Sequence, residues 1–167
     1  MILYHGSNVY IHNIELERCR PYKDFGRGFY CTTIKSQAEL MAKRVATIYG
    51  GSTSVTQFQF DERIFTDTNV NIKKFAGASK DWAMFVINNR NKYFKQIGSL
   101  ECNQDNKYDI VIGPVANDDL ALLFRTFING YIDLDALING LKYKKLTDQY
   151  SFHTDKVLQY LKPVGGI

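Results

Sequence analysis

The 167-residue chain is 45% hydrophobic and 14% aromatic, which is enough apolar material for one domain, residues 1–167, with a sizeable core. Its 21 Lys and Arg residues are nearly matched by 17 Asp and Glu residues, and no polybasic tail stands out. The formal net charge of +4 therefore allows an anionic ligand without demanding nucleic acid.

The three cysteines are an odd number without C-x-x-C spacing, which argues against a disulfide framework and against a zinc cluster. The start of the sequence lacks the pattern of an export signal, and no apolar run approaches the length that spans a bilayer. We therefore expect a cytoplasmic protein in a reducing compartment, with no membrane partner.

The first predicted element is a short strand over Ile2–His5, closed by the turn signal Gly6-Ser7-Asn8. This strand places His5 at its end. Two interpretations of His5 stay open at this point: a residue of a functional site, or a structural histidine that bonds a backbone carbonyl.

Gly26-Arg27-Gly28 leads directly into the aromatic run Phe29-Tyr30-Cys31-Thr32-Thr33. Glycines on both sides of an arginine free the backbone for positive φ and for close approach to a ligand. The pattern predicts a turn that enters a strand, and it fits both an ordinary tight turn and a turn that cradles a ligand.

A helix is predicted after this strand, because Ser36 and Glu39 have capping-box spacing and the helical pattern ends at Gly50-Gly51. Its apolar residues at helical spacing are expected to face the core, with Met41 as core rather than as pocket lining; they are Leu40, Met41, Val45 and Ile48. Alternation over Val55–Phe60 then predicts a half-buried strand, with a second short strand at Ile64-Phe65.

The second half of the chain predicts a helix over Lys80–Asn91 that packs Trp82 into the core, and a buried strand over Tyr108–Val115. Two helices that end at Asn-Gly follow, then an alternating strand and a short closing helix. These last elements are Asp118–Asn129, Asp133–Leu141, Thr147–His153 and Asp155–Leu161. Residues 163–167 carry no signal.

The sequence resembles the ADP-ribosyltransferase superfamily at three motifs, which follow one another in the same order as in that superfamily. They are His5-Gly6-Ser7, Gly26-Arg27-Gly28-Phe29-Tyr30 and Asp148-Gln149-Tyr150. The branch concerned includes diphtheria toxin and the poly(ADP-ribose) polymerases. The chain is more similar still to a family of small bacterial proteins of unassigned function. That likeness rests on Asp24–Thr33, Ile110–Asp118 and Gln149–Thr154, so it covers nearly the whole chain.

The resemblance implies an α+β fold in which split antiparallel β-sheets with flanking helices surround an NAD cleft. His5 would bind the adenine-side ribose, and the backbone of Gly6 would pair with the nicotinamide carboxamide, whose donor and acceptor match a peptide. Tyr30 would stack on the nicotinamide ring. Other NAD contacts would come from Ser7, Arg27 and Gly28, with Arg27 either on the pyrophosphate or solvated in its turn.

Gln149 departs from the family pattern, which usually has a glutamate at this catalytic position. Glutamine keeps a hydrogen bond to the ribose but loses the charge, and such a loss commonly costs on the order of 10² to 10³ in rate. Asp148 is a poor substitute because neighbouring side chains of a strand point to opposite faces. His153 lies on the same face as Gln149 in a regular strand, as a site residue or a bystander.

The resemblance therefore implies a mono-ADP-ribosyltransferase with His5, Tyr30 and Gln149 as its catalytic residues. It would use NAD as a substrate and need no metal. The acceptor would be a protein or a nucleic acid, and a toxin-like role restrained by a partner antitoxin protein is expected.

Two other classes of function stay open. Gln149 favours a catalytically weak or inactive module that binds NAD, ADP-ribose or a protein. Exposed aromatic residues beside Lys92 and Lys95 allow a nucleic-acid binder. The polar stretch Asn88–Asn106 is either a cover for the cleft or an ordinary surface loop.

Overall fold

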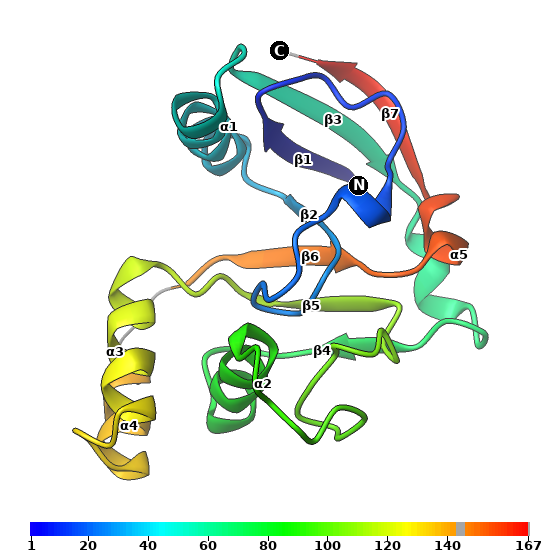
Figure 1. Cartoon of the computed structure of the whole chain (residues 1–167). Helices are drawn as coiled ribbons and strands as arrows, with labels where there is room; N and C mark the ends of the chain where they lie inside the picture. Colours follow the sequence, from blue (N-terminus) through cyan, green and yellow to red (C-terminus); the bar gives the residue numbers. More distant parts are fainter. Residues whose placement is uncertain (143–145, 167) are drawn as a thin grey trace.

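The computed structural model describes residues 1–142 and 146–166, and within them seven strands form one mixed sheet with the order β4-β5-β6-β2-β1-β3-β7 (Figure 1). The strands β4 and β5 run parallel, and every other neighbouring pair is antiparallel. The strands are β1 (Ile2–Ser7), β2 (Phe29–Thr32), β3 (Ser54–Phe60), β4 (Ile72–Lys74), β5 (Ile110–Pro114), β6 (Asp148–Phe152) and β7 (Leu161–Gly166).

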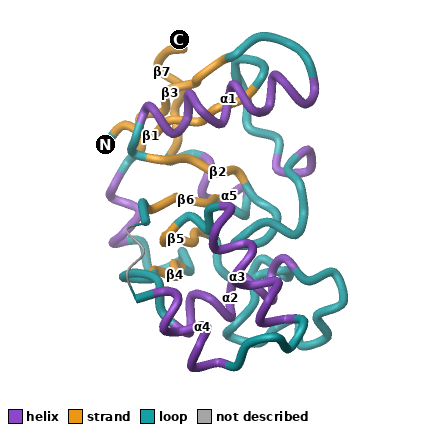
Figure 2. Tube along the Cα trace, turned by 90° about the vertical axis from the view of Figure 1, so that its left-hand side faces the viewer, coloured by secondary structure: helices purple, strands orange, loops and turns teal. Residues whose placement is uncertain are grey.

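The helices divide between the two ends of the sheet. Figure 2 shows α1 alongside the end that carries β1 and β3, and α2, α3 and α4 grouped at the end that carries β4 and β5. The α-helices are α1 (Lys35–Tyr49), α2 (Lys80–Arg90), α3 (Asp118–Ile128), α4 (Leu134–Leu141) and α5 (Asp155–Leu158). The α+β class predicted from the sequence is confirmed.

Two large hydrophobic clusters cover the two faces of the sheet, because successive strand residues point to opposite sides. A third, smaller cluster lies between α1 and the sheet. Tyr30 belongs with Trp82 and the residues of α2, α3 and α4, whereas Phe29 belongs with Leu3, Phe58 and Phe152. Trp82 is fully buried, as expected, and its ring nitrogen donates to the carbonyl oxygen of Pro114 at 3.1 Å. The three cysteines are free.

The strands expected over Ile2–His5, Val55–Phe60, Tyr108–Val115 and Thr147–His153 are confirmed with small shifts of their ends. The expected strand at Ile64-Phe65 is wrong: residues Glu62–Thr66 form a 3₁₀-helix whose first turn is capped by the Asp61 carboxylate. Residues 163–166, which carry no signal in the sequence, belong to the edge strand β7 that pairs with β3. The three-residue strand β4 was also missed.

The helix expected after Ser36 exists, but its cap and its buried face were predicted wrongly. Ile34 occupies the N-cap position, and no side chain caps the helix. The large residues Leu40, Met41 and Ile48 are exposed, whereas the small Ala38 and Ala42 face the sheet. The backbone of α1 thus lies directly against β1, where larger side chains would hold it away.

The other helices follow the expectations with two corrections. Asn117 and Asp133 cap α3 and α4 by accepting from the backbone of the first turn. The stop at Asn129-Gly130 is confirmed, with Gly130 at φ 75°. However, α4 ends at Leu141 as expected, so Asn139-Gly140 lies inside the helix and is not its stop signal. The closing helix expected over Asp155–Leu161 ends at Leu158, and Leu161 is the first residue of β7.

The two small sheets implied by the resemblance form one continuous sheet, and β1 and β2 connect its two halves over a short length. Tyr4 and Thr32 are the one registered pair between β1 and β2, whereas β1 and β3 share six consecutive pairs, from Ile2↔Gln59 to Ser7↔Ser54. The strands β1 and β2 therefore diverge immediately after Tyr4, which places His5 and Gly6 beside the point of divergence.

None of the helices in residues 1–142 and 146–166 combines the length and apolarity that a bilayer crossing requires.

Candidate functional site

The turn over Asp24–Gly28 places Tyr30 at the start of β2, and both of its glycines have a structural reason. Gly26 has φ 96°, a conformation that residues with a Cβ rarely adopt. A Cβ on Gly28 would lie 2.6 Å from the Nδ1 atom of His153 and 2.7 Å from the carbonyl oxygen of Phe152. The Gly-x-Gly pattern is thus explained by packing within the protein.

The His153 side chain supports this turn by hydrogen bonding to its backbone. Its ring is buried, with Nδ1 2.7 Å from the carbonyl oxygen of Arg27 and Nε2 2.8 Å from the Ser151 hydroxyl. Burial lowers the pKa of His153 to about 4, although the Arg27 carbonyl and Asp109 oppose the shift. In a neutral ring, Nδ1 donates to the Arg27 carbonyl, and Nε2 shares the single hydrogen of the Ser151 hydroxyl with the carbonyl oxygen of Val111, which lies 3.0 Å from that hydroxyl. Both ring nitrogens of His153 thus have partners within the protein, which agrees with the interpretation of His153 as a bystander.

The hydroxyl group of Tyr30 is fixed by the same turn. It accepts from the backbone N–H of Phe25 at 3.0 Å and donates to the carbonyl oxygen of Gly26 at 2.8 Å. Burial raises the pKa of Tyr30 well above its ordinary value, and the nearby Asp24 carboxylate raises it further. Tyr30 is therefore a neutral residue with an immobilised ring, and its half-buried side chain packs beside Phe25 and His153.

His5 lies at the point where β1 and β2 separate. Its Nδ1 atom is 2.7 Å from the carbonyl oxygen of Tyr30, and its ring stacks on Phe29 with the ring centroids 4.2 Å apart. Burial lowers the pKa of His5, and the hydrogen bond to the carbonyl opposes this shift. A neutral ring that donates from Nδ1 has Nε2 left as an acceptor. His5 thus bonds a backbone carbonyl, as one of its two interpretations held, and keeps one nitrogen for a ligand.

The peptide edge of Gly6 extends beyond the last pair between β1 and β2. Met1 and Phe60 exchange two backbone hydrogen bonds of 2.9 Å, so the alternation of an antiparallel ladder turns the polar groups of Leu3, His5 and Ser7 toward β3. Those of Tyr4 and Gly6 point the other way. Tyr4 pairs with β2, and the polar groups of Gly6 reach the space where β2 has diverged.

Gly6 also has a packing role, because α1 crosses it directly. A Cβ at this position would overlap the carbonyl oxygen of Ala38 and would lie 2.8 Å from the backbone nitrogen of Ala42. Ser7, one residue further along, is half-buried at the end of β1, with its hydroxyl 3.5 Å from the side-chain oxygen of Asn8. The side chain of Arg27 is exposed to solvent.

Gln149 lies in β6, opposite Thr32 of β2 and Gly113 of β5. Its Nε2 atom donates to Oδ2 of Asp24 at 2.9 Å and approaches the carbonyl oxygen of Pro114 at 3.5 Å. Among the residues that the structure describes, no group donates to the Oε1 atom of Gln149, and this oxygen is not buried. The position thus presents a neutral acceptor to solvent.

Asp24 and Arg90 complete this polar group and were missed as site residues. Oδ1 of Asp24 accepts from Nε and Nη2 of Arg90 at 3.0 and 2.6 Å, and Oδ2 accepts from the backbone N–H of Ala116 at 3.1 Å. Asp24 is 8% exposed. Its place next to Phe25-Gly26 in a recognised motif was a usable signal, whereas Arg90 is 66 residues away and carried none.

The register of the sheet decides which predicted residues share a face. Tyr30 pairs with Ser151 and Thr32 with Gln149, so Tyr30 and Gln149 project from one face of the sheet. His5 alternates with Tyr4, the partner of Thr32, and so belongs to the opposite face with Phe29. The His5 ring therefore contacts the backbone carbonyl of Tyr30, while the Tyr30 side chain lies on the other face of the sheet.

The segment after α2 supports the turn from its far side. Asn103 is buried, donates to the carbonyl oxygens of Phe25 at 3.4 Å and Tyr108 at 3.2 Å, and receives the backbone N–H of Tyr108 at 2.8 Å. Tyr93 is 84% exposed, and Lys92 lies over the ring of Tyr22.

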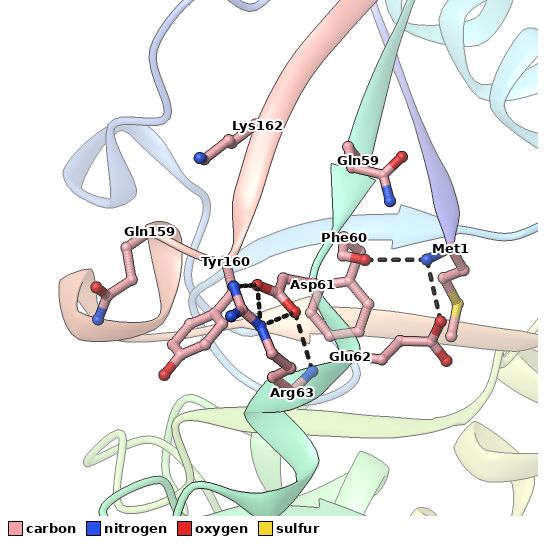
Figure 3. Close-up of a pocket in the computed structure, with 9 residues that line it drawn as sticks. All are labelled: Met1, Gln59, Phe60, Asp61, Glu62, Arg63, Gln159, Tyr160 and Lys162. Atoms are coloured by element: carbon pink, nitrogen blue, oxygen red, sulfur yellow. Dashed lines mark hydrogen bonds and ion pairs between the residues drawn. The ribbon is translucent and has the colours of Figure 1, made fainter.

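A surface hollow of about 720 Å³ lies at the other end of β1 and β3, away from the predicted site residues (Figure 3). Figure 3 shows its charges largely paired: the N-terminal ammonium group binds Glu62 at 3.1 Å, and Arg63 grips the Asp61 carboxylate. Lys162 also lines this hollow. Neither His5, Tyr30 nor Gln149 does, so it is separate from the expected NAD site.

Across residues 1–142 and 146–166, the His, Cys, Asp and Glu side chains form no group that could hold a metal ion. Among the predicted site residues, the polar groups left for an organic ligand include the peptide edge of Gly6, Nε2 of His5 and Oε1 of Gln149. These groups suit hydroxyl and carboxamide partners, since they offer several neutral acceptors and one backbone donor.

Neither a curated protein nor a solved structure matches the chain. A family model described as "Protein of unknown function (DUF3990)" matches residues 1–162. Because this match covers nearly the whole sequence, the chain belongs to the DUF3990 family of proteins of unknown function.

Proposed function

We propose that this protein is a mono-ADP-ribosyltransferase that moves ADP-ribose from NAD to a macromolecular acceptor. The observation that carries the proposal is the divergence of β1 from β2, where His5 binds the Tyr30 carbonyl and the peptide edge of Gly6 extends past the ladder. A peptide edge presents a donor and an acceptor in one plane, which matches a nicotinamide carboxamide. The resemblance stated above assigns this contact to the same residue.

In this proposal, NAD binds where β1 and β2 separate, and residues on both sides of the separation contact it. The fixed ring of Tyr30 stacks on the nicotinamide ring, and Nε2 of His5 accepts from a hydroxyl of the adenine-side ribose. Ser7 and Arg27 contact ribose or phosphate groups, with the exposed Arg27 free to reach the pyrophosphate. The Oε1 atom of Gln149 accepts from the ribose 2′-hydroxyl of the nicotinamide side.

The reaction breaks the bond between the nicotinamide nitrogen and C1′ of the ribose. Nicotinamide leaves with the bonding electrons, and the acceptor nucleophile forms a new bond to C1′ and loses a proton. Positive charge builds on the ribose before the new bond forms. Gln149 stabilises this charge less than a carboxylate does, so we propose slow, single transfers instead of polymer growth, with positioning of the two substrates as the main contribution.

The acceptor is a protein or a nucleic acid, and a partner protein that restrains the activity is part of the proposal. We place the reaction in the cytoplasm, where NAD is available. The second candidate is a module that binds NAD or ADP-ribose without turnover. It is favoured by the pairing of Asp24 with Arg90, which neutralises the carboxylate that binds Gln149.

The test is nicotinamide release and transfer of label from radiolabelled NAD, with and without cell lysate. His5→Asn and His5→Gln form the sharpest pair of variants. Asparagine keeps a donor near Nδ1 for the Tyr30 carbonyl and loses the Nε2 acceptor, whereas glutamine does the reverse. His12→Asn changes an exposed histidine outside the candidate site and is the control.

A transferase predicts that His5→Asn stays folded but loses most of the label transfer, with His12→Asn unchanged. Tyr30→Ala should abolish transfer as well. NAD binding without nicotinamide release supports the binding module. If the folded wild-type protein neither binds NAD nor releases nicotinamide, both candidates are wrong.

A further inference from the structure

The carboxylate of Asp24 is surrounded by hydrogen-bond donors on every side. Its two oxygens receive four donors: Nε and Nη2 of Arg90, the backbone N–H of Ala116 and Nε2 of Gln149. A carboxylate only accepts hydrogen bonds. Position 149 must therefore offer a donor toward Asp24, which an amide supplies and a carboxylate does not.

We propose that Asp24 is a positioning residue that fixes the amide of Gln149 with its oxygen turned outward, so that the site offers a neutral acceptor to a ligand hydroxyl. With Nε2 held by Asp24 at 2.9 Å, Oε1 is the atom left for the ligand. The ligand-facing half of this inference rests on the proposed function, and the orientation of the amide does not.

The same geometry explains why a glutamine can stand where the resembled family has a glutamate. An ionised glutamate at position 149 would bring a second carboxylate to hydrogen-bonding distance of Asp24, with Arg90 as the one side-chain cation that binds Asp24 in the described part of the chain. Two carboxylates at such a distance cannot both stay ionised without a large cost. Restoring the usual glutamate alone therefore damages this site instead of improving it.

Removing the charge of Asp24 is expected to reverse the orientation of the Gln149 amide. In Asp24→Asn, Arg90 retains the side-chain oxygen, so the new NH2 group takes the place of Oδ2 and faces Gln149 and the Ala116 N–H. Gln149 satisfies this donor by rotating Oε1 inward, whereas the Ala116 N–H loses its acceptor. The ligand would then meet Nε2, a donor. The double variant Asp24→Asn/Gln149→Glu again pairs a donor with an acceptor and leaves a carboxylate oxygen outward.

The experiment is a double-mutant cycle over Asp24→Asn, Gln149→Glu and their combination, read by urea unfolding at pH 7. We expect each single change to raise the unfolding equilibrium constant at least tenfold, and the double variant to be at least tenfold more stable than the sum of the single effects predicts. Asp61→Asn, which breaks an exposed pair with Arg63, is the matched control and should cause a much smaller change.

Two further readouts separate orientation from general stability. The side-chain amide signals of Gln149 in an ¹⁵N-correlation spectrum should be widely split in the wild type and should move in Asp24→Asn but not in Asp61→Asn. In NAD titrations, Asp24→Asn should weaken binding at least tenfold, and the double variant should recover most of that loss.

The outcomes distinguish this inference from the proposed function. A coupled cycle and a shifted amide signal in a protein that does not bind NAD support the orientation and overturn the transferase. Nicotinamide release by the wild type, together with an additive cycle and an unmoved amide signal, supports the transferase and overturns the role of Asp24. A Gln149→Glu variant as stable as the wild type also overturns it.

Discussion

Replacing His153 by asparagine tests whether the turn that carries Tyr30 is held by a neutral histidine. Burial lowers the pKa of this ring to about 4 in the folded protein, against an ordinary value of 6.5. Between these two values the unfolded chain binds a proton that the folded chain does not, so folding stability rises with pH across this window. The contribution is fully present above pH 6.5 and is lost as the pH falls through 4.

The size of the effect follows from the shift. A difference of about 2.5 pH units at 1.36 kcal/mol each gives about 3 kcal/mol. This is a substantial fraction of the 5 to 15 kcal/mol by which a domain is usually stable, at an order-of-magnitude level. Asp109 and the Arg27 carbonyl oppose the shift, and His5, whose pKa is also lowered by burial, adds to the slope in the same direction.

The assay is urea unfolding at several pH values from 4 to 7, together with NMR titration of the histidine rings. His153→Asn keeps a donor for the Arg27 carbonyl but cannot be protonated, so its stability should vary less with pH than that of the wild type by about 2 to 3 kcal/mol across this range. His12→Asn should keep the wild-type slope. A His153 signal that titrates near 6.5 in the folded protein would refute the reasoning.

Two further predictions concern residues on either side of the strand divergence, both measured as the free energy of unfolding in urea. Gly6→Ala should cost about 3 kcal/mol or more because its Cβ overlaps the backbone of α1, while Gly165→Ala, in open space on β7, should change stability by less than about 0.5 kcal/mol; equal effects would contradict the close packing. Tyr30→Phe should cost about 1 to 3 kcal/mol, since two backbone groups lose their partner, and it should keep NAD binding if the ring alone makes the stacking contact.

The elements that could be predicted are those whose own residues decide them. The β-branched run of β5 and the alternation of β3 need no distant partner to be recognised, and both strands are where the sequence placed them. In contrast, β7 contains Pro163 and two glycines without alternation. It is a strand because the free edge of β3 is available to it, which no local pattern reveals.

The prediction of the buried face of α1 was wrong for a related reason. Large apolar residues at helical spacing usually mark the face toward the core, but here Leu40 and Met41 are exposed and Ala38 and Ala42 are buried. The deciding residue is Gly6 in another element, because its missing side chain lets the helix backbone approach the strand. Helical periodicity carries no information about a glycine in a distant strand.

The candidate site also depends on contacts between distant segments, which a local sequence pattern does not reveal. His5, Tyr30 and Gln149 were found by their motifs, and Asp24 was within one of them without a role assigned. Arg90 has no motif, and it enters the site through an ion pair that spans 66 residues of sequence. Gly28 was predicted as an NAD contact, and the structure adds a packing role that the sequence did not reveal, because a Cβ at this position would meet the His153 ring.

The segment Asp24–Tyr30 connects the two features that define the site. Its first residue sets the orientation of Gln149 through a side-chain hydrogen bond, and the carbonyl of its last residue binds His5 where the strands diverge. Between them, the segment is held by His153 on the Arg27 carbonyl and by Asn103 on the Phe25 carbonyl. A shift of this short segment would act on both features together, because Asp24 and the Tyr30 carbonyl are both part of it. The site is therefore organised by a turn whose stability depends on a neutral buried histidine, and protonation of that histidine should loosen the acceptor at Gln149 and the divergence at His5 in one step.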